Sequence, residues 1–150
     1  MLCLPKGLEA VGAEWFSWSD IEKVFIPNTV RELGESAFSS CLQLCEVVFE
    51  PGSQLETIGV GCFDSCGLDE VTVPRSVRNI GSSAFINCQS LRSFTFEEGS
   101  QLAHVGKHIV DNTMLDLDEI EFPSTVRTGG NEETGFADAS VYDYTDSDES

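Results

Sequence analysis

Hydrophobic positions return along this chain in one fixed order, five times over. Each copy places an aliphatic residue, an aliphatic residue followed by Gly, a small residue followed by Phe, and a Cys, with two variable residues in each interval. The three clearest copies occupy residues 30–41, 55–66 and 77–88, and two weaker ones begin at Leu8 and Leu102. A segment of about 20–25 residues cannot bury its own apolar side and must stack on its neighbours. The pattern therefore predicts a solenoid.

A second hydrophobic pattern precedes the Gly-Phe-Cys segment. An aliphatic residue, two variable residues and then two apolar residues two apart occur at residues 21–26, 44–49, 68–73, 91–96 and 117–122. Alternation that ends on β-branched and aromatic residues indicates a strand, and one strand per repeat gives a parallel sheet. Pro ends three of these strands and a Gly-Ser turn follows the other two, because Pro cannot donate to a ladder and Gly relaxes the backbone.

The spacing of the copies alternates. From Val30 to Val77 and from Leu55 to Leu102 the chain advances 47 residues, whereas the single steps are 25 and 22 residues. The turn after the strand alternates in the same way, between Pro-x-(Ser/Thr)-Val and Gly-Ser-Gln-Leu. The spacing predicts that the genetic unit is a pair of repeats.

These residues resemble the leucine-rich repeats of the BspA-like (Treponema pallidum-type) subclass, whose unit runs roughly Leu-x-x-Ile-x-Ile-Pro-x-x-Val-x-x-Ile-Gly-x-x-Ala-Phe-x-x-Cys. The resemblance covers about residues 2–127. The copy that begins at Leu8 departs from it at Trp15 and Ser19, and the copy that begins at Leu102 departs at Ile109 and Thr113, as terminal repeats that cap a stack do. The resemblance implies an α/β repeat fold, a leucine-rich repeat solenoid with a parallel β-sheet on one face and short helical or turn segments on the other.

Composition changes near Thr128. Beyond it, seven acidic residues and no basic residue accompany almost no apolar periodicity. Such a segment has too little hydrophobic mass to offset the entropy of ordering. We therefore predict a leucine-rich repeat domain over 1–127, with about five repeats of which the first and last are degenerate, and a disordered acidic tail over 128–150.

The tail has one non-specific interpretation, as a solubilising segment, and two functional interpretations. Thr145 with Asp148 three residues later resembles an acidophilic kinase site. Tyr142 and Tyr144 lie among acids, which would suit sulfation if the protein is exported. The role of the tail stays open at this point.

Charge narrows the classes of partner. The chain has 26 Asp and Glu against 8 Lys and Arg, a net charge of −18. A field of this sign repels phosphate backbones and anionic lipid surfaces, so nucleic-acid binding and peripheral membrane binding are disfavoured. No stretch approaches the roughly 18 apolar residues of a membrane span, and the first residues lack the features of a secretory signal. We expect either an intracellular, cytoplasmic protein or an internal piece of a longer protein exported to the cell surface.

The cysteines are predicted to be mostly core residues. Cys41, Cys66 and Cys88 occupy one place in successive repeats, where other copies have Ser or Thr, which favours small, buried, weakly polar packing. Cys62 takes the place of an Ala and is also expected in the core. No Cys-x-x-Cys pair exists that would indicate a zinc site. The same pattern predicts Cys3 and Cys45 on strands, at outward-facing positions, where they are the most reactive of the six.

The two histidines, His104 and His108, are the one remaining pair of candidate metal ligands, and they are four residues apart. On a helix this step would put both imidazoles on one face. Both fall at variable positions, however, and Gly106 between them belongs to a turn, so we expect surface residues and no metal or other cofactor. A Cys–His nucleophile would require a core thiol such as Cys88 to leave its packing. The sequence therefore predicts no enzyme.

The family resemblance implies that the outward residues of the strands bind other proteins. The expected inner row is Phe25, Val48, Thr72, Thr95 and Glu121, and the row beside it is Lys23, Glu46, Glu70, Ser93 and Glu119. Phe25 and Val48, with Cys45, would form a small apolar patch next to acids, as protein interfaces do. The alternative is that these are ordinary strand residues with high β-propensity.

Two hypotheses about function follow. The leading one is a non-enzymatic protein-binding module that resembles BspA-like cell-surface adhesins. The alternative is an intracellular scaffold or regulatory protein that binds a cytosolic partner through the same face. Six cysteines without evident pairing slightly favour the reducing compartment of the second hypothesis. The identity of the protein partner and the oligomeric state are not determined by the sequence.

Overall fold

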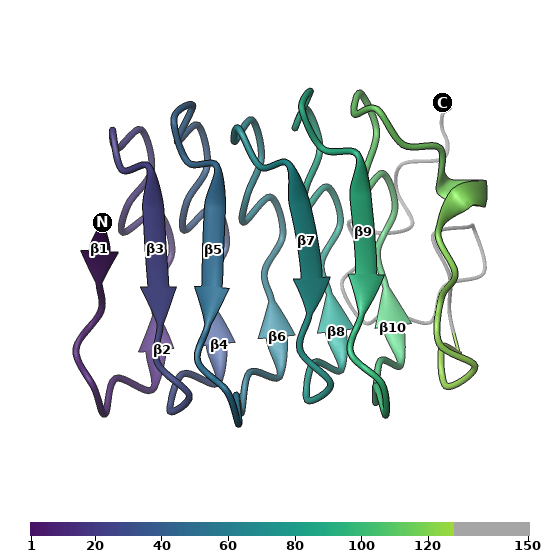
Figure 1. Ribbon diagram of the computed structural model, residues 1–150, viewed down its shortest axis with the longest axis horizontal. Coiled ribbons are helices and arrows are strands. Elements are labelled where there is room, and N and C mark those ends of the chain that lie inside the picture. Colours follow the sequence, from purple (N-terminus) through teal and green to yellow (C-terminus); the bar gives the residue numbers. More distant parts are fainter. Residues whose placement is uncertain (128–150) are drawn as a thin grey trace.

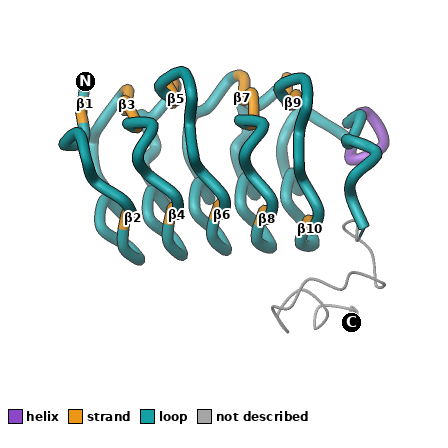
Figure 2. The backbone as a smooth tube through the Cα atoms, turned by 90° about the horizontal axis from the view of Figure 1, so that it is seen from below, coloured by secondary structure: helices purple, strands orange, loops and turns teal. Residues whose placement is uncertain are grey.

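Each repeat supplies strands to two layers on opposite sides of the solenoid. The computed structural model describes residues 1–127, and its two layers of strands are seen in Figure 1 and, from below, in Figure 2. The first layer holds β1 (Leu2–Cys3), β3 (Lys23–Ile26), β5 (Glu46–Phe49), β7 (Glu70–Val73) and β9 (Ser93–Phe96). The second holds β2 (Ala10–Val11), β4 (Glu32–Leu33), β6 (Thr57–Ile58), β8 (Asn79–Ile80) and β10 (His104–Val105).

Neighbouring repeats are stacked in register. Every strand pair in the described residues is parallel, and each pairs equivalent positions, such as Val24 with Val47 and Ile58 with Ile80. The chain is therefore a parallel-strand β-solenoid of about five turns, as the repeat pattern predicted.

The second layer differs from the expectation of helical or turn segments. It is a continuous sheet of two-residue strands in the order β10-β8-β6-β4-β2, followed in each repeat by turns. A single 3-10 helix, η1 (Leu117–Glu119), is the only helix within residues 1–127. No helix in this part of the chain has the length and apolar character needed to cross a membrane.

The turns have a backbone that excludes a right-handed helix. Two residues in each repeat have positive φ, at equivalent positions two and six residues after the repeat Gly. The first set is Glu14, Ser36, Gly61, Ser83 and His108, and the second is Trp18, Ser40, Ser65, Asn87 and Asn112. Residues in the left-handed region interrupt α-helical geometry, so the helical alternative was wrong for these segments and the turn alternative holds.

The expected fifth strand at 117–122 is also not formed. Leu115 packs against the core, and its N–H bonds to the hydroxyl of Thr113 as that of Ile21 bonds to Ser19. Leu117, which we aligned with the core position, is 41% exposed and begins η1. Two additional residues before Ile120 therefore become a 3-10 turn instead of continuing a strand.

The core is a set of ladders made by equivalent side chains. Phe38, Phe63 and Phe85 are fully buried, and their rings stack at centroid distances of 5.3 Å. Phe16 extends the stack to the first repeat at 5.4 Å from Phe38. Because the repeats are in register, every buried position adds another ladder of this kind, and the apolar core runs the length of the solenoid.

The repeat glycines permit this close stacking. The N–H of Gly59 donates to the carbonyl of Leu33, and that of Gly81 to the carbonyl of Ile58, each at 2.8 Å. A Cβ added at Gly59 or Gly81 would lie 2.7 or 2.6 Å from backbone atoms of the preceding repeat. Gly is therefore required at this place because the neighbouring backbone occupies the space of a side chain.

The ladder of rings leads to a prediction about stability. Phe63→Ala removes the middle ring, and we expect the free energy of unfolding to fall by about 3–5 kcal/mol, since a large cavity is left between two repeats. Urea unfolding monitored by circular dichroism measures the change. Phe25→Ala is the matched control, because the Phe25 ring is half-buried on the outward side of β3. Equal losses in the two variants would contradict the proposed role of the ladder.

Candidate protein-binding face

The outward residues of the first layer form two parallel rows. Lys23 pairs in register with Glu46 and Phe25 with Val48, and further along Glu70 pairs with Ser93 and Thr72 with Thr95. All eight are exposed or half-exposed. Cys45, immediately before β5, is also exposed. The strands thus place these residues on one side of the solenoid.

Two residues of the expected face lie elsewhere in the backbone. Glu119 belongs to η1 and Glu121 follows it, so neither lies on a strand. Both side chains are exposed. The strand rows therefore end at Ser93 and Thr95, because the additional residues of the last repeat replace its strand.

Polar side chains link equivalent positions along the face. Lys23 Nζ lies 3.2 Å from Glu46 Oε1, and the hydroxyls of Thr72 and Thr95 are 3.2 Å apart. Arg92 reaches toward the start of β7, where its Nη2 lies 3.5 Å from Asp69 Oδ2. Exposed ion pairs of this kind contribute about 0–1 kcal/mol each, so they orient side chains more than they stabilise the fold.

The first layer is interrupted between the second and third full repeats. Its strands form two separate sheets, β1-β3-β5 and β7-β9, while β4 and β6 behind them are paired. Among the described residues no backbone hydrogen bond joins β5 to β7. Figure 1 shows these two strands farther apart than β3 and β5 or β7 and β9. The solenoid is therefore continuous on one side and open on the other.

Two local features of the sequence accompany the interruption. Glu50 N–H donates to Ile26 and Glu97 N–H donates to Val73, each at 3.0 Å, which closes the end of each paired ladder. The equivalent residue after β7 is Pro74, which has no N–H to donate to Phe49. In addition, the connection that leads into β7 is shorter than the one that leads into β5. One residue separates Cys66 from Leu68, whereas two residues separate Cys41 from Leu44.

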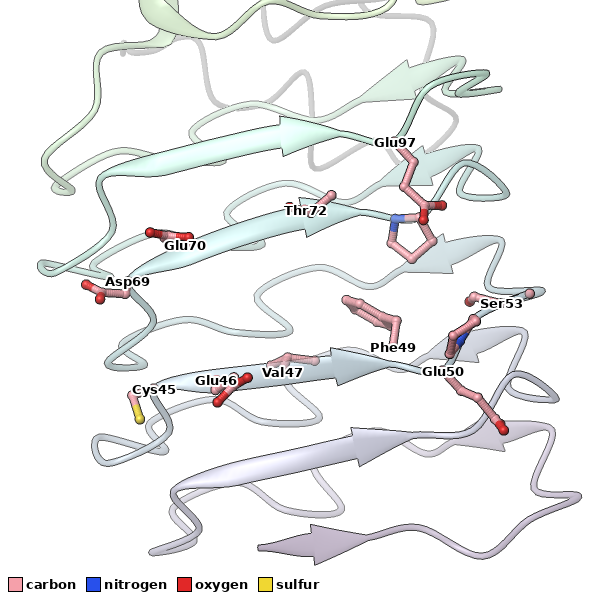
Figure 3. Close-up of a pocket in the computed structure, with 13 residues that line it drawn as sticks. Cys45, Glu46, Val47, Phe49, Glu50, Ser53, Asp69, Glu70, Thr72 and Glu97 are labelled. Carbon is pink, nitrogen blue, oxygen red and sulfur yellow. The ribbon is translucent and has the colours of Figure 1, made fainter.

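A groove of about 600 Å³ lies over this interruption. Its lining includes Val47 and Phe49 from β5 and Thr72 from β7, together with acidic residues at both ends of the strands. Figure 3 shows the Phe49 ring pointing into the space between β5 and β7. Val47 and Phe49 are half-exposed, although the equivalent residues of β3, Val24 and Ile26, are fully buried. Separation of the strands has thus uncovered core positions.

The groove recurs at the next junction between repeat pairs. A smaller one, of about 370 Å³, is lined by Phe96, Glu97, Gly99, Ser100 and residues that include Pro123. Phe96 to Ser100 lie 47 residues beyond their counterparts in the first groove. The pairs β3–β5 and β7–β9 therefore keep ladder hydrogen bonds inside them, and a groove follows each of these two pairs. Sequence reasoning missed the groove, although the alternating spacing and Pro were its visible signals.

The core thiols make hydrogen bonds between repeats. Their Sγ atoms donate to the carbonyl of the Phe in the preceding repeat. These bonds are Cys41 to Phe16 at 3.0 Å, Cys66 to Phe38 at 3.1 Å and Cys88 to Phe63 at 3.0 Å. All six cysteines, which lie within residues 1–127, are free, and four of them are buried as expected. Burial raises the pKa of all four core thiols, that of Cys88 to about 12.

The two histidines do not share a helix face. His104 lies on β10, whereas His108 lies in the following turn with a φ of 61°. His108 Nδ1 contacts Asp111 Oδ2. The helix that a metal pair would have needed is therefore not formed. Within residues 1–127, no group of three or more His, Cys, Asp and Glu side chains is arranged to hold a metal ion.

In-register strands, stacked rings and close-packed glycines together define a leucine-rich repeat solenoid. The sequence matches the family described as "BspA type Leucine rich repeat region" over residues 9–136, in six copies, one more than the five that we recognised. The chain belongs to this family. No curated protein matches the sequence.

Two solved structures are similar to this chain. The pneumococcal vaccine antigen PcpA is 24% identical, with a TM-score of 0.75 over 87% of this chain and 36% of its own. A leucine-rich repeat protein from Bacteroides ovatus is 21% identical, with a TM-score of 0.49 over 88% of this chain and 48% of its own. The likeness to the pneumococcal protein shows the fold, and the chain spans about a third of that protein's length.

A pair of proline substitutions tests whether the second edge of β5 is open. Because successive residues direct their backbone groups to opposite neighbours, Val48 faces β3 and Val47 faces the groove. We expect Val48→Pro to lower the free energy of unfolding by about 1–3 kcal/mol more than Val47→Pro, since only Val48→Pro breaks a ladder hydrogen bond. Urea unfolding measures both. Equal losses would contradict an open edge at Val47.

Thiol reactivity tests the packing of the cysteines. The thiolate is the reactive form, and a thiol whose pKa is raised stays protonated at pH 8. We expect Ellman's reagent at this pH to find two rapid thiols per folded chain, Cys3 and Cys45, and four more after unfolding in urea. The Cys3→Ser, Cys45→Ser double variant is the control. Rapid reaction of that folded variant would show that the core thiols are accessible.

Proposed function

We propose that this chain is a non-enzymatic protein-binding module, and that it binds through the outward residues of its first layer of strands. The family and the solenoid fold support a repeat module that binds proteins, and both are typically non-enzymatic. The observation that carries the proposal is the pair of in-register rows on one side of the solenoid. A flat, regular surface of this kind distributes recognition over many side chains.

The chemistry of the face supports a protein partner. Phe25 and Val48 lie side by side and half-exposed, and Glu46, on the same strand as Val48, is exposed. Interfaces commonly have apolar anchors within a polar rim. The acidic charge of the chain, −18 overall, favours partners with basic surfaces and disfavours nucleic acid.

The leading role within this proposal is adhesion at a cell surface. It is supported by the likeness to the pneumococcal protein, which is a vaccine antigen. The alternative is an intracellular scaffold that uses the same face. Two exposed free thiols, Cys3 and Cys45, favour it, because reducing compartments keep such thiols free. The buried thiols favour neither role, since they serve as core packing.

Site-specific photocrosslinking tests the proposal. A photoreactive residue is introduced at Thr95, on the face, or at Glu32 on β4, on the opposite layer. After incubation with the source cells, we expect one protein adduct from the Thr95 position at a yield at least tenfold above that from Glu32. An adduct on intact cells supports adhesion, and an adduct only after lysis supports the scaffold. Equal yields at the two positions would contradict binding through this face.

A further inference from the structure

The groove between β5 and β7 combines an open strand edge, uncovered apolar side chains and acidic ends. This combination occurs inside the proposed binding face but differs from its flat rows (Figure 3). The inference below rests on the proposed protein-binding function, and gives it a site and a partner chemistry.

The edge of β5 offers hydrogen-bonding groups to an added strand. Since Glu50 N–H bonds to Ile26 on β3, the alternating backbone directs the N–H and C=O of Val47 and Phe49 toward the groove. No backbone group of β7 forms a hydrogen bond with these groups of Val47 and Phe49. Open edges of this kind are the templates to which extended peptides add as strands.

The edge of β7 offers fewer backbone hydrogen-bond donors than the edge of β5. By the same alternation, Glu97 N–H bonds to Val73, so Thr72 and Pro74 are the residues that face β5. Pro74 has no N–H, which leaves a gap in the donors along this edge. An extended segment in the groove therefore pairs better with β5 than with β7.

The floor of the groove is apolar. Beneath Val47 and Phe49, a narrow cleft between the two strands is lined by Phe63, Leu68 and Phe85, which are core residues. Side chains that alternate along an extended peptide would place every second one over this floor. Apolar residues at those positions would cover Val47 and Phe49 as a neighbouring strand covers their equivalents.

The ends of the groove are acidic. Lining residues Glu46, Asp69 and Glu70 lie where the strands begin, and Glu50 and Glu97 lie where they end. Lys23, Arg75 and Arg92 form ion pairs with four of these five acids. The acids still exceed the bases, and the chain as a whole carries −18. The charge therefore selects a basic occupant, and it disfavours the chain's own acidic residues 128–150.

We infer that this groove binds an extended basic segment of a partner protein as an added strand along β5. Its apolar side chains alternate toward the floor, and Arg or Lys residues at its two ends meet the acids. The strand length of four residues and the groove volume of about 600 Å³ suit a segment of about five residues.

The first test uses a defined peptide. Fluorescein-labelled Gly-Arg-Val-Thr-Val-Arg-Gly is titrated with the full chain, and binding is followed by anisotropy. We expect saturable binding, and at least tenfold weaker binding of the peptide with Glu in place of both Arg. Two further peptides carry N-methyl groups either on both Val or on Arg and Thr. We expect one of these two peptides to bind at least tenfold more weakly, because only one of the two methylated sets of N–H groups faces β5.

Matched protein variants locate the site. Glu46→Lys with Glu70→Lys reverses charge in the groove, and Glu32→Lys with Glu35→Lys makes the same change on exposed residues outside it. We expect at least tenfold weaker peptide binding for the first variant and less than twofold for the second. Circular dichroism of both confirms the fold. Equal effects, or unchanged binding of both N-methylated peptides, would overturn the inference.

The outcome also separates this inference from the proposed function. If the peptide does not bind but the Thr95 position still crosslinks a protein, the groove site is wrong and the face proposal stands. If the Thr95 and Glu32 positions crosslink equally while the peptide binds as expected, the flat face is wrong and the groove remains. No binding in either experiment overturns both.

Discussion

Backbone contact between equivalent positions of adjacent repeats is the constraint on which this structure depends. The N–H of Gly59 bonds to Leu33 at 2.8 Å, and the N–H of Phe38 bonds to Cys62 at 2.9 Å, so successive coils are held one directly over the next. Once the backbones are in register, side chains at the same position must stack on one another. The stacked Phe rings, the glycines without space for a Cβ and the thiols that donate to Phe carbonyls all follow from this contact.

The junction between β5 and β7 is where this contact is kept on one side of the solenoid and lost on the other. On the far side, β4 and β6 remain paired, and Gly59 still bonds to Leu33. On the near side, Pro74 lacks the N–H that would bond to Phe49. The segment that leads into β7 is also one residue shorter than the segment that leads into β5. The solenoid stays intact through its second layer, while the first layer has two additional strand edges. Regular stacking and a specialised groove therefore coexist in one repeat array.

Much of the first layer and of the core was predictable from the sequence. Leu33, Ile58 and Ile80 recur at one position of the repeat, and all three are fully buried. The four strands at 23–26, 46–49, 70–73 and 93–96 fall within the predicted segments, because alternating hydrophobicity marks a half-buried strand directly. The segment 117–122 misled the same reasoning, since its alternation continued although two inserted residues had changed its place in the stack.

The short strands of the second layer left no such signal. A strand of two residues, such as Glu32–Leu33, is too short for alternation to be recognised, and its pairing exists only because neighbouring repeats bring equivalent backbones together. The grooves had signals in the sequence, namely Pro74 and the alternating steps of 25 and 22 residues, but these indicated a pair of repeats and not an opening.

By itself, the sequence determined the repeat, the residues of the core and the side of each strand that faces outward, because periodic hydrophobicity decides which side chains must be buried. Only the tertiary structure decided which strands pair, that β5 and β7 do not, and that Val47 and Phe49 are uncovered between them. Pairing depends on where backbone donors and acceptors of two repeats, more than 20 residues apart in sequence, come to lie relative to one another. No local pattern of hydrophobic and polar residues contains that relation.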